Sequence, residues 1–371
     1  MNEEKILNSE NTGLIETVND TDFVAGGETG ITYEILNESG DWETFKPSDE
    51  WQRKYKSGKL GYDSHSCVTF SGLNLLETVF NFMIKKGLLS EKAIKWLEDN
   101  GYIVEGFVNF NDWFTAVMSG TTDDGNSKPA VWDSIRNHGV LPQSEGYQVN
   151  DFNERSEYLG TKPTQEQKDK ALKFKEIFEI KYEWVVLGQV LDFNVIEKHL
   201  KQSPLHISTP TCAGWNTQPP KLVTDCGVKT TNHATLYIGM EKEKYHKDLD
   251  HYNPFVKHLA WDYFIAYALK AIVIERKEQE EKQKPVPPTT NLQYGSTQPE
   301  VKELQEVLQY LIDKKTGLPY MKPGVFGPYG PQTRAAVAAF QLEHKIQNTP
   351  QGNNYGPKTR AKMIEVLKDY K

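Results

Sequence analysis

The charged and proline-rich run at residues 276–290 limits the fold of this chain more than any other feature. Its sequence, R-K-E-Q-E-E-K-Q-K-P-V-P-P-T-T, mixes both signs of charge and then turns to proline. Such a stretch cannot bury a core, and proline-rich segments act as stiff spacers. The sequence therefore predicts a domain at residues 1–275, a linker at 276–290 and a second domain at 291–371.

Within the first domain, a largely buried helix is predicted to begin at or just after Cys67. Apolar residues repeat there at helical spacing, at Leu73, Leu76, Phe80, Met83 and Ile84, and Gly87 ends the pattern. The unpaired N–H groups and positive dipole end of such a helix favour a thiolate and lower the pKa of a cysteine. The alternative is that Cys67 is simply a small buried apolar residue.

His233 is predicted to lie at the start of a strand. Ala234, Leu236 and Ile238 alternate with polar residues, as in a half-buried strand. An imidazole at such a strand end can face a cleft, although a structural role is equally consistent with the position. Downstream, either Asp250 or Asn253 could accept a hydrogen bond from the ring and fix its tautomer.

The order Cys, His and then Asp or Asn, with its flanking sequence, resembles the papain-like cysteine peptidases. The matching segments are C-V-T-F-S, G-V-L-P-Q-S-E-G-Y, S-P-L-H-I-S and C-G-V-K-T-T-N-H-A-T-L-Y-I-G, spread over much of residues 1–275. The resemblance implies an α+β fold with a helical lobe and an antiparallel β lobe. It also implies that Cys67 is the nucleophile, His233 the general base and acid, and Asp250 the orienting residue, where most members have asparagine.

The chain departs from this family in two places. The C-G-[SA]-C-[WY] signature is absent, because Ser64 and Val68 replace its first cysteine and its aromatic residue. The residue six before Cys67, where the family's oxyanion glutamine is expected, is Gly61. Gln52 is the nearest candidate for that role, with a surface glutamine as the alternative. The segment 23–47 alternates like strands and turns, and we expect it to belong to the domain.

No cofactor or metal ion is expected. Cys212 and Cys226 do not form a C-x-x-C pair, and a site made of Cys226, His233 and either Asp63 or His65 would be scattered along the chain. The sequence neither requires nor excludes a Cys212–Cys226 disulfide. Four further residues are expected to pack in the core or to line a cleft: His206, Trp113, Trp132 and Trp215.

The second domain is predicted to be a small three-helix unit. Val301, Leu304, Val307, Leu308 and Leu311 lie on one face of a helix that ends near Gly317. Two similar segments follow, G-P-Y-G-P-Q-T-R-A-A-V from residue 327 and N-Y-G-P-K-T-R-A-K-M from residue 354. In each, Gly-Pro makes a turn and proline opens a helix.

This second domain resembles the peptidoglycan-binding domain 1 family. The family pattern V-K-x-L-Q, G-x-F-G and T-x-x-A-V-x-x-F-Q appears at residues 301–305, 324–327 and 333–341. The resemblance implies a shallow groove that holds cell-wall glycan or stem peptide. Its candidate ligand-binding residues are Phe326, Tyr329, Arg334 and Tyr355. For Phe326 and for Phe340, packing in the core is the preferred interpretation.

Composition narrows the partners and the location. The 371-residue chain has a net charge of −8, which argues against nucleic acid as the main partner. The first residues lack the basic start and apolar core of a signal peptide, and no apolar run is long enough to span a membrane. We therefore expect synthesis in the cytoplasm and action at the bacterial cell wall, reached by lysis, a holin or a virion.

Together these features predict a cell-wall-targeted cysteine peptidase or amidase of bacteriophage or prophage origin, such as an endolysin, whose substrate is a peptidoglycan peptide. Hydrolysis and acyl transfer to an amine use the same triad and are not distinguished by sequence. The alternative is a virion or tail protein that binds the wall, with an inactive papain-like domain or one that processes virion proteins.

Overall fold

The computed structural model describes residues 13–16, 36–186, 193–211, 215–216, 222–224, 226–276, 284–322, 324–347 and 352–369. The chain divides into two compact units, Met1–Arg276 and Lys277–Lys371. Each unit has its own hydrophobic core. This division falls at the charged run that the sequence predicts to be a linker.

Helix α1 (Cys67–Lys85) is the centre of the first unit. Every residue from Cys67 to Met83 is buried, as expected for a helix that is apolar on all sides. Among the described helices, α1 is the one long and apolar enough to cross a membrane, but its surface is buried inside the unit. It is therefore a core helix, and it begins at the cysteine, as the sequence predicts.

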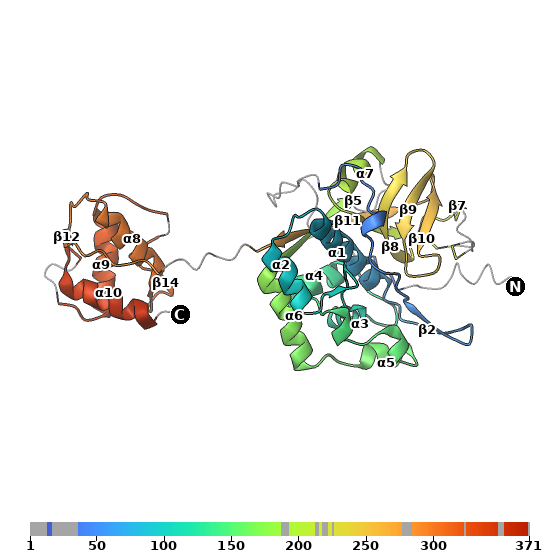
Figure 1. Ribbon diagram of the computed structural model, residues 1–371, viewed down its shortest axis with the longest axis horizontal. Helices are drawn as coiled ribbons and strands as arrows, with labels where there is room; N and C mark the ends of the chain where they lie inside the picture. The colour runs from blue at the N-terminus through green and yellow to red at the C-terminus, as the bar shows by residue number, and fades with distance from the viewer. Residues whose placement is uncertain are drawn as a thin grey trace. The chain divides into compact units, whose positions relative to one another are not determined.

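The other helices of this unit are α2 (Glu91–Asp99), α3 (Asp112–Met118), α4 (Lys128–His138), α5 (Arg155–Gly160), α6 (Gln165–Ile177) and α7 (Phe193–Leu200). Side chains cap several of them: Ser90, Asn111, Ser127 and Thr164 each accept a hydrogen bond from a backbone N–H in the first turn. Figure 1 shows α2 to α6 gathered on one side of α1 and strands β8, β9 and β10 on the other.

A seven-stranded sheet forms the β part of the unit, in the order β5-β11-β6-β8-β9-β10-β7. The strands are β5 (Phe178–Val186), β6 (Leu205–Thr209), β7 (Leu222–Val223), β8 (His233–Glu241), β9 (Tyr245–Leu249), β10 (Val256–Ala260) and β11 (Ala266–Glu275). All described pairs are antiparallel except β10 with β7. The β8–β9 hairpin brings the end of β9, and hence Asp250, beside the start of β8 at His233.

Short β pairs complete the first unit: β1 (Arg53–Lys56) with β2 (Lys59–Asp63), and β3 (Ile103–Val104) with β4 (Phe107–Val108). Of the segment 23–47, residues 23–35 lie outside the described residues. The rest packs onto α1, since the ring centroids of Trp42 and Phe45 each lie 4.9 Å from that of Phe82.

The second unit contains α8 (Glu300–Tyr310), α9 (Pro331–Glu343) and α10 (Pro357–Asp369), with two short β pairs, β12 (Leu292–Gln293) with β15 (Asn354–Tyr355) and β13 (Ile312–Asp313) with β14 (Leu318–Pro319). The predicted α+β class with a small C-terminal helical domain is confirmed. One detail differs. The Pro288 carbonyl, within the expected linker, accepts hydrogen bonds from the Tyr355 hydroxyl at 2.9 Å and Arg360 Nε at 2.7 Å, so this stretch packs onto the unit.

Candidate active site

Cys67 is the first residue of α1 and is fully buried. It is a free thiol, and the backbone N–H of Ala234, the residue after His233, acts on its pKa. Burial raises the pKa of the thiol to about 12, against the opposing influence of the Ala234 N–H. The expectation of a lowered pKa is therefore wrong for this conformation, because loss of water outweighs the helix end.

His233 and Asp250 are joined directly. Imidazole Nε2 lies 2.7 Å from Asp250 Oδ1, and both side chains are fully buried. The other carboxylate oxygen, Oδ2, accepts from Trp215 Nε1 at 2.7 Å and lies 3.0 Å from Lys257 Nζ. Asp250, and not Asn253, is thus the residue that holds the ring.

Burial would raise the pKa of Asp250, but the charge of Lys257 and the contact with His233 hold it well below its ordinary value. The residue is therefore an ionised carboxylate. An ionised acceptor on Nε2 fixes the proton of a neutral imidazole at that nitrogen, which makes Nδ1 the basic nitrogen of the ring.

Aromatic side chains pack around the His233 ring. Tyr252 stacks on it with ring centroids 5.1 Å apart and an angle of 8° between the planes, while Trp215 and His251 meet it edge-on at 5.9 Å and 5.3 Å. Of these, the sequence analysis singled out Trp215 alone. The stack and the hydrogen bond together leave the imidazole little freedom to rotate.

Gln52 lies in the same neighbourhood and is fully buried. Its amide nitrogen donates to Asp63 Oδ1 at 2.7 Å and to the Tyr252 hydroxyl at 2.8 Å. The alternative of a surface glutamine is wrong. Its role at an oxyanion stays a prediction, and in this conformation both amide hydrogens are already engaged, so that role would need a rearranged amide.

The segment Gly13–Glu16 packs on residues near Cys67 in the sequence and on the charged group that acts on it. It pairs with Asn126, and Leu14 belongs to the same hydrophobic cluster as Cys67. Glu16 Oε1 lies 3.3 Å from the Nζ of buried Lys128, whose charge acts on the thiol, and it also accepts a hydrogen bond from Ser208. This segment therefore packs against His65 and Lys128.

His206 is a buried residue of β6 rather than a second catalytic histidine. Its Nε2 lies 2.8 Å from Ser71 Oγ, and its Nδ1 accepts a hydrogen bond from Trp132 Nε1 at 3.1 Å. Trp113 and Trp132 are both fully buried core residues. None of the three therefore lines an open cleft.

The metal site considered from sequence is not assembled, because Cys226 is disulfide-bonded and Asp63 Oδ2 lies 2.5 Å from Arg53 Nε. Cys212 lies outside the described residues. Among the described residues, one group has ligand atoms close enough to share an ion, namely His233, Asp250 and His251. Two of its three members are already hydrogen-bonded to each other as the imidazole and carboxylate of the candidate site.

The candidate ligand-binding residues of the second unit differ in how exposed their side chains are. Tyr329 and Tyr355 are fully buried, and their hydroxyls donate to the carbonyls of Gly352 and Pro288. As folded, they support the core and cannot stack on a ligand. Phe340 is also buried, as expected, whereas the core interpretation of Phe326 is wrong, because 48% of it is exposed.

Arg334 is exposed, and its guanidinium lies 5.7 Å from the centroid of the Tyr294 ring. Tyr294 is itself 49% exposed, and the sequence analysis did not single it out. An exposed aromatic ring beside an exposed arginine is a surface suited to stacking and hydrogen bonding.

Two buried glutamines account for the repeated sequence of this unit. Gln305 Nε2 donates to Thr333 Oγ1 at 2.8 Å and to the Gly327 carbonyl at 3.0 Å. Gln341 Nε2 donates to Thr359 Oγ1 at 2.9 Å and to the Asn354 carbonyl at 2.9 Å. Thr333 and Thr359, one in each of the two similar segments, thus have the same structural role. The sequence showed only that the segments are similar.

Comparison with known proteins gave one family match and several similar solved structures. Residues 297–363 match the family described as putative peptidoglycan binding domain, whereas no curated protein gives a significant match. Solved structures similar to the chain include the bromelain protease from Ananas comosus (14% identity, TM-score 0.42, 62% of this chain and 96% of that one). A second is digestive procathepsin L 3 of Tenebrio molitor larval midgut (14% identity, TM-score 0.45, 73% of this chain and 79% of that one). A third is xylellain, a cysteine protease from Xylella fastidiosa (15% identity, TM-score 0.46, 70% of this chain and 94% of that one). Residues 297–363 of the chain are thus a putative peptidoglycan binding domain, and the solved structures similar to the chain are cysteine proteases.

Proposed function

We propose that this protein is a cysteine peptidase or amidase that cleaves amide bonds in peptidoglycan peptides, with Cys67, His233 and Asp250 as its triad. The observation that carries the proposal is the buried 2.7 Å contact between His233 Nε2 and Asp250 Oδ1. The start of the same strand supplies the Ala234 N–H, which acts to lower the pKa of Cys67. A thiol, an imidazole and a carboxylate in this order are the groups that covalent acyl transfer requires.

The chemistry follows from the position of the ring protons. With Nε2–H held by Asp250, Nδ1 takes the thiol proton as the sulfur attacks the amide carbonyl. The imidazolium then gives that proton to the leaving amine as the C–N bond breaks. Water, deprotonated by the same nitrogen, cleaves the thioester, and the thiol returns. Transfer to an amine instead of water would follow the same steps.

The proposal requires the site to open. Cys67 and His233 are both fully buried, and a substrate carbonyl must reach the sulfur. Displacement of Gly13–Glu16 would expose this region to water and lower the pKa of the thiol, because burial is the main cause of its increase. We propose that the active form is this opened one.

The second unit supports the choice of substrate. A peptidoglycan-binding module holds the catalytic unit near an insoluble polymer and raises its effective concentration without changing the reaction. The proposed place of action is therefore the bacterial cell wall. The proposed biological role is that of a phage or prophage lytic enzyme, either free or carried in a virion.

The test compares the wild type with Cys67→Ala on purified cell walls. We expect the wild type to clear walls in a zymogram and the variant to lose clearing, while both sediment equally with insoluble peptidoglycan. Mass spectrometry of the released fragments identifies the bond and separates hydrolysis from acyl transfer. Clearing by Cys67→Ala at the wild-type rate would rule out the triad.

The second candidate is a wall-binding virion or tail protein with an inactive catalytic unit. The buried site, the raised pKa of Cys67 and the engaged amide of Gln52 favour it. In the same experiment this function predicts binding by both proteins and clearing by neither.

A further inference from the structure

The carboxylate of Glu16 lies in a site built from three distant parts of the first unit. Its Oε1 lies 3.3 Å from Nζ of Lys128, the first residue of α4, and accepts a hydrogen bond from Ser208 Oγ in β6. Thr231 Oγ1, two residues before β8, donates to the same oxygen at 3.5 Å. Lys128 also donates to Ser208. One carboxylate oxygen thus has an ammonium and two hydroxyls as donors, a set suited to binding an anion.

Lys128 makes this site costly to leave without an anion. Its side chain is 1% exposed, and among the carboxylates of the described residues, that of Glu16 is the one that forms an ion pair with it. Removing one partner of a buried pair is strongly destabilising, because the other charge stays buried. The side chain of Glu16 is itself 20% exposed, so the space that it fills leads from solvent to the ammonium. If Glu16 moves away, another carboxylate can reach Lys128 by the same path.

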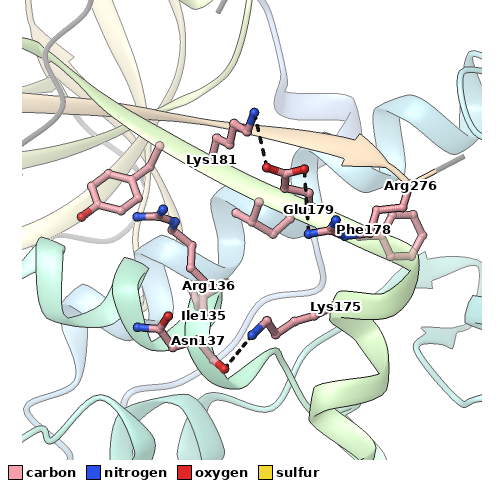
Figure 2. A pocket seen from close by; sticks show the side chains of 10 residues that line it. Ile135, Arg136, Asn137, Lys175, Phe178, Glu179, Lys181 and Arg276 are labelled. Carbon is pink, nitrogen blue, oxygen red and sulfur yellow. Dashed lines mark hydrogen bonds and ion pairs between the residues drawn. The ribbon is translucent and has the colours of Figure 1, made fainter. Parts of the chain in front are cut away.

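The cations near the other end of α4 differ from Lys128 in this respect. They line an open cavity of about 360 Å³ (Figure 2). There Lys181, whose side chain is 36% exposed, lies 3.3 Å from Glu179, and Lys175 donates to the carbonyl of Asn137 at 2.8 Å. Water reaches the ammonium of Lys181, so it needs no further anion. The need for an anion at Lys128 arises from its burial.

The segment that carries Glu16 is held as an extended peptide is held, by its backbone. The Asn126 N–H donates to the Gly13 carbonyl at 2.8 Å, and the Ile15 N–H donates to the Asn126 carbonyl at 2.8 Å. At this end of the segment, a Cβ on Gly13 would overlap the carbonyl oxygen of His65. His65 precedes the cysteine of the candidate triad by two residues.

The other end of the segment reaches the strand that begins at His233. Ser208, which donates to Glu16, lies opposite Ala234 in the antiparallel pair of β6 and β8, and Thr231 precedes His233 by two residues. The segment therefore extends between residues that flank the two halves of the candidate triad. A peptide that takes its place through the same backbone hydrogen bonds would lie beside the triad, with one side chain directed to the buried ammonium.

We propose that Lys128, Ser208 and Thr231 form a subsite for a carboxylate of the substrate, and that Glu16 occupies this subsite when no substrate is bound. The ligand class is an extended peptide with an ionised carboxylate, on a side chain or at its C-terminus, at the position of Glu16. This inference rests on the proposed function, because it assumes that the triad acts on the bound peptide. Binding of the carboxylate itself does not need the triad and is measured separately.

Titration calorimetry of the full chain tests the subsite. The background protein carries Cys67→Ala, which prevents cleavage, and Glu16→Gln, which neutralises the internal carboxylate. One pair of probes is acetyl-alanyl-glutamyl-alanine amide and its glutaminyl counterpart. The other pair is acetyl-trialanine as the free acid and as the amide. We expect at least one acidic probe to bind at least tenfold more tightly than its neutral counterpart, and the pair that shows this preference tells whether the carboxylate is on a side chain or at a C-terminus.

Further variants test which residues bind the acidic probe. Restoring Glu16 should weaken its binding at least tenfold, because the internal carboxylate competes for the same donors. Adding Lys128→Gln to the background should remove the preference for the acidic probe. Because Glu16→Gln is already present, this change leaves no carboxylate without its cation. Ser208→Ala is a smaller change at the same site and should also reduce the preference. Lys181→Gln, the matched control, removes a lysine from the cavity in Figure 2 and should leave the preference unchanged.

Equal binding of the acidic and neutral probes, including no measurable binding of either, overturns the proposal. A preference that persists in both Lys128→Gln and Ser208→Ala, or that Lys181→Gln removes, overturns it as well. The catalytic function is decided by the wall-clearing assay. Failure of the wild type to clear walls contradicts the triad, whereas a missing carboxylate preference in calorimetry contradicts the subsite alone.

Discussion

At the scale of single residues, the buried charge of Asp250 depends on Lys257. The ammonium lies 3.0 Å from Asp250 Oδ2 and donates to the carbonyls of Tyr252 and Pro254. Lys257→Met leaves the carboxylate without its cation, which typically costs about 3–5 kcal/mol for a buried pair. We expect a loss of this size in the free energy of unfolding of the first unit, measured with urea at pH 7.

The matched control is Lys244→Met, which removes an exposed lysine paired with Glu241. Surface pairs contribute about 0–1 kcal/mol, so this variant should unfold almost as the wild type does. An equally small effect of Lys257→Met would mean that Asp250 is not held as an anion.

A second residue-scale prediction concerns the buried carboxyl groups of Glu77, Glu50 and Asp112. Burial, together with the neighbouring charge of Glu50, raises the pKa of Glu77 well above its ordinary value. Between the unfolded pKa of about 4.3 and the raised folded value, the folded state holds a proton that the unfolded state releases. This contribution to stability is therefore lost as the pH rises.

Glu77→Gln removes this dependence and keeps an oxygen that can accept from the Phe110 N–H. The difference in unfolding free energy between variant and wild type should shift in favour of the variant from pH 5 to pH 8, by at most ~1.4 kcal/mol per pH unit. Urea unfolding at several pH values measures this difference. The control is Glu98→Gln, at an exposed residue, for which the difference from the wild type should not change with pH. A difference that does not change with pH contradicts the raised pKa.

The sequence led to Cys67, His233 and Asp250 because their flanking segments resemble a known pattern. It could not supply the partners that decide their chemistry. Trp215 and Lys257 reach Asp250 through folding of distant segments. The burial that raises the pKa of the Cys67 thiol is likewise a property of the folded chain. Tyr329 and Tyr355 failed as surface candidates for the same reason, since exposure is a property of packing.

At the scale of elements, we predict that the segment Gly13–Glu16 controls access to the thiol. Gly13 has φ of +102°, and a Cβ there would overlap the backbone carbonyl of His65. Gly13→Ala should therefore displace the segment, bring water to Cys67 and lower its pKa. We expect alkylation of Cys67 by iodoacetamide at pH 8 to become at least tenfold faster, as followed by mass spectrometry.

Gly58→Ala controls for the backbone effect alone. Gly58 also has a positive φ, +78°, but nothing lies within 4 Å of the position of its Cβ. Both substitutions strain the backbone by roughly 1 kcal/mol, so only Gly13→Ala should change reactivity. Equal alkylation rates would show that the segment does not shield the sulfur.

In the second unit, helices α9 and α10 each have in their first turn a threonine that accepts a hydrogen bond from a buried glutamine. Thr333→Val keeps the shape of the side chain but removes the hydroxyl that accepts from buried Gln305. A buried donor left without its acceptor costs about 1–3 kcal/mol. Urea unfolding should show this loss, and Thr359→Val should show a similar one through Gln341. Exposed Thr297→Val should stay within about 0.5 kcal/mol of the wild type.

Sequence periodicity predicts elements and not their neighbours. Helix α1 and strand β8 follow from strong local patterns. In contrast, the pairing of β5 with β11 joins residues 178–186 to residues 266–275, and nothing local in either strand specifies its partner. The sequence did not predict that Pro288 packs onto the second unit. The linker was predicted from the average composition of residues 276–290, which does not distinguish one residue of the run from another.

At the scale of the whole molecule, the two units should unfold independently. Each has its own hydrophobic core, and the chain divides between Arg276 and Lys277. Multidomain chains of this kind violate two-state behaviour, so calorimetry of the full chain should show two transitions.

Substitutions in separate cores that share no partner should act separately. Lys257→Met should lower the melting temperature of one transition and Thr333→Val that of the other, and the double variant should show both shifts. A single transition that both substitutions shift would mean that the units are coupled, and that the second unit does more than tether the first.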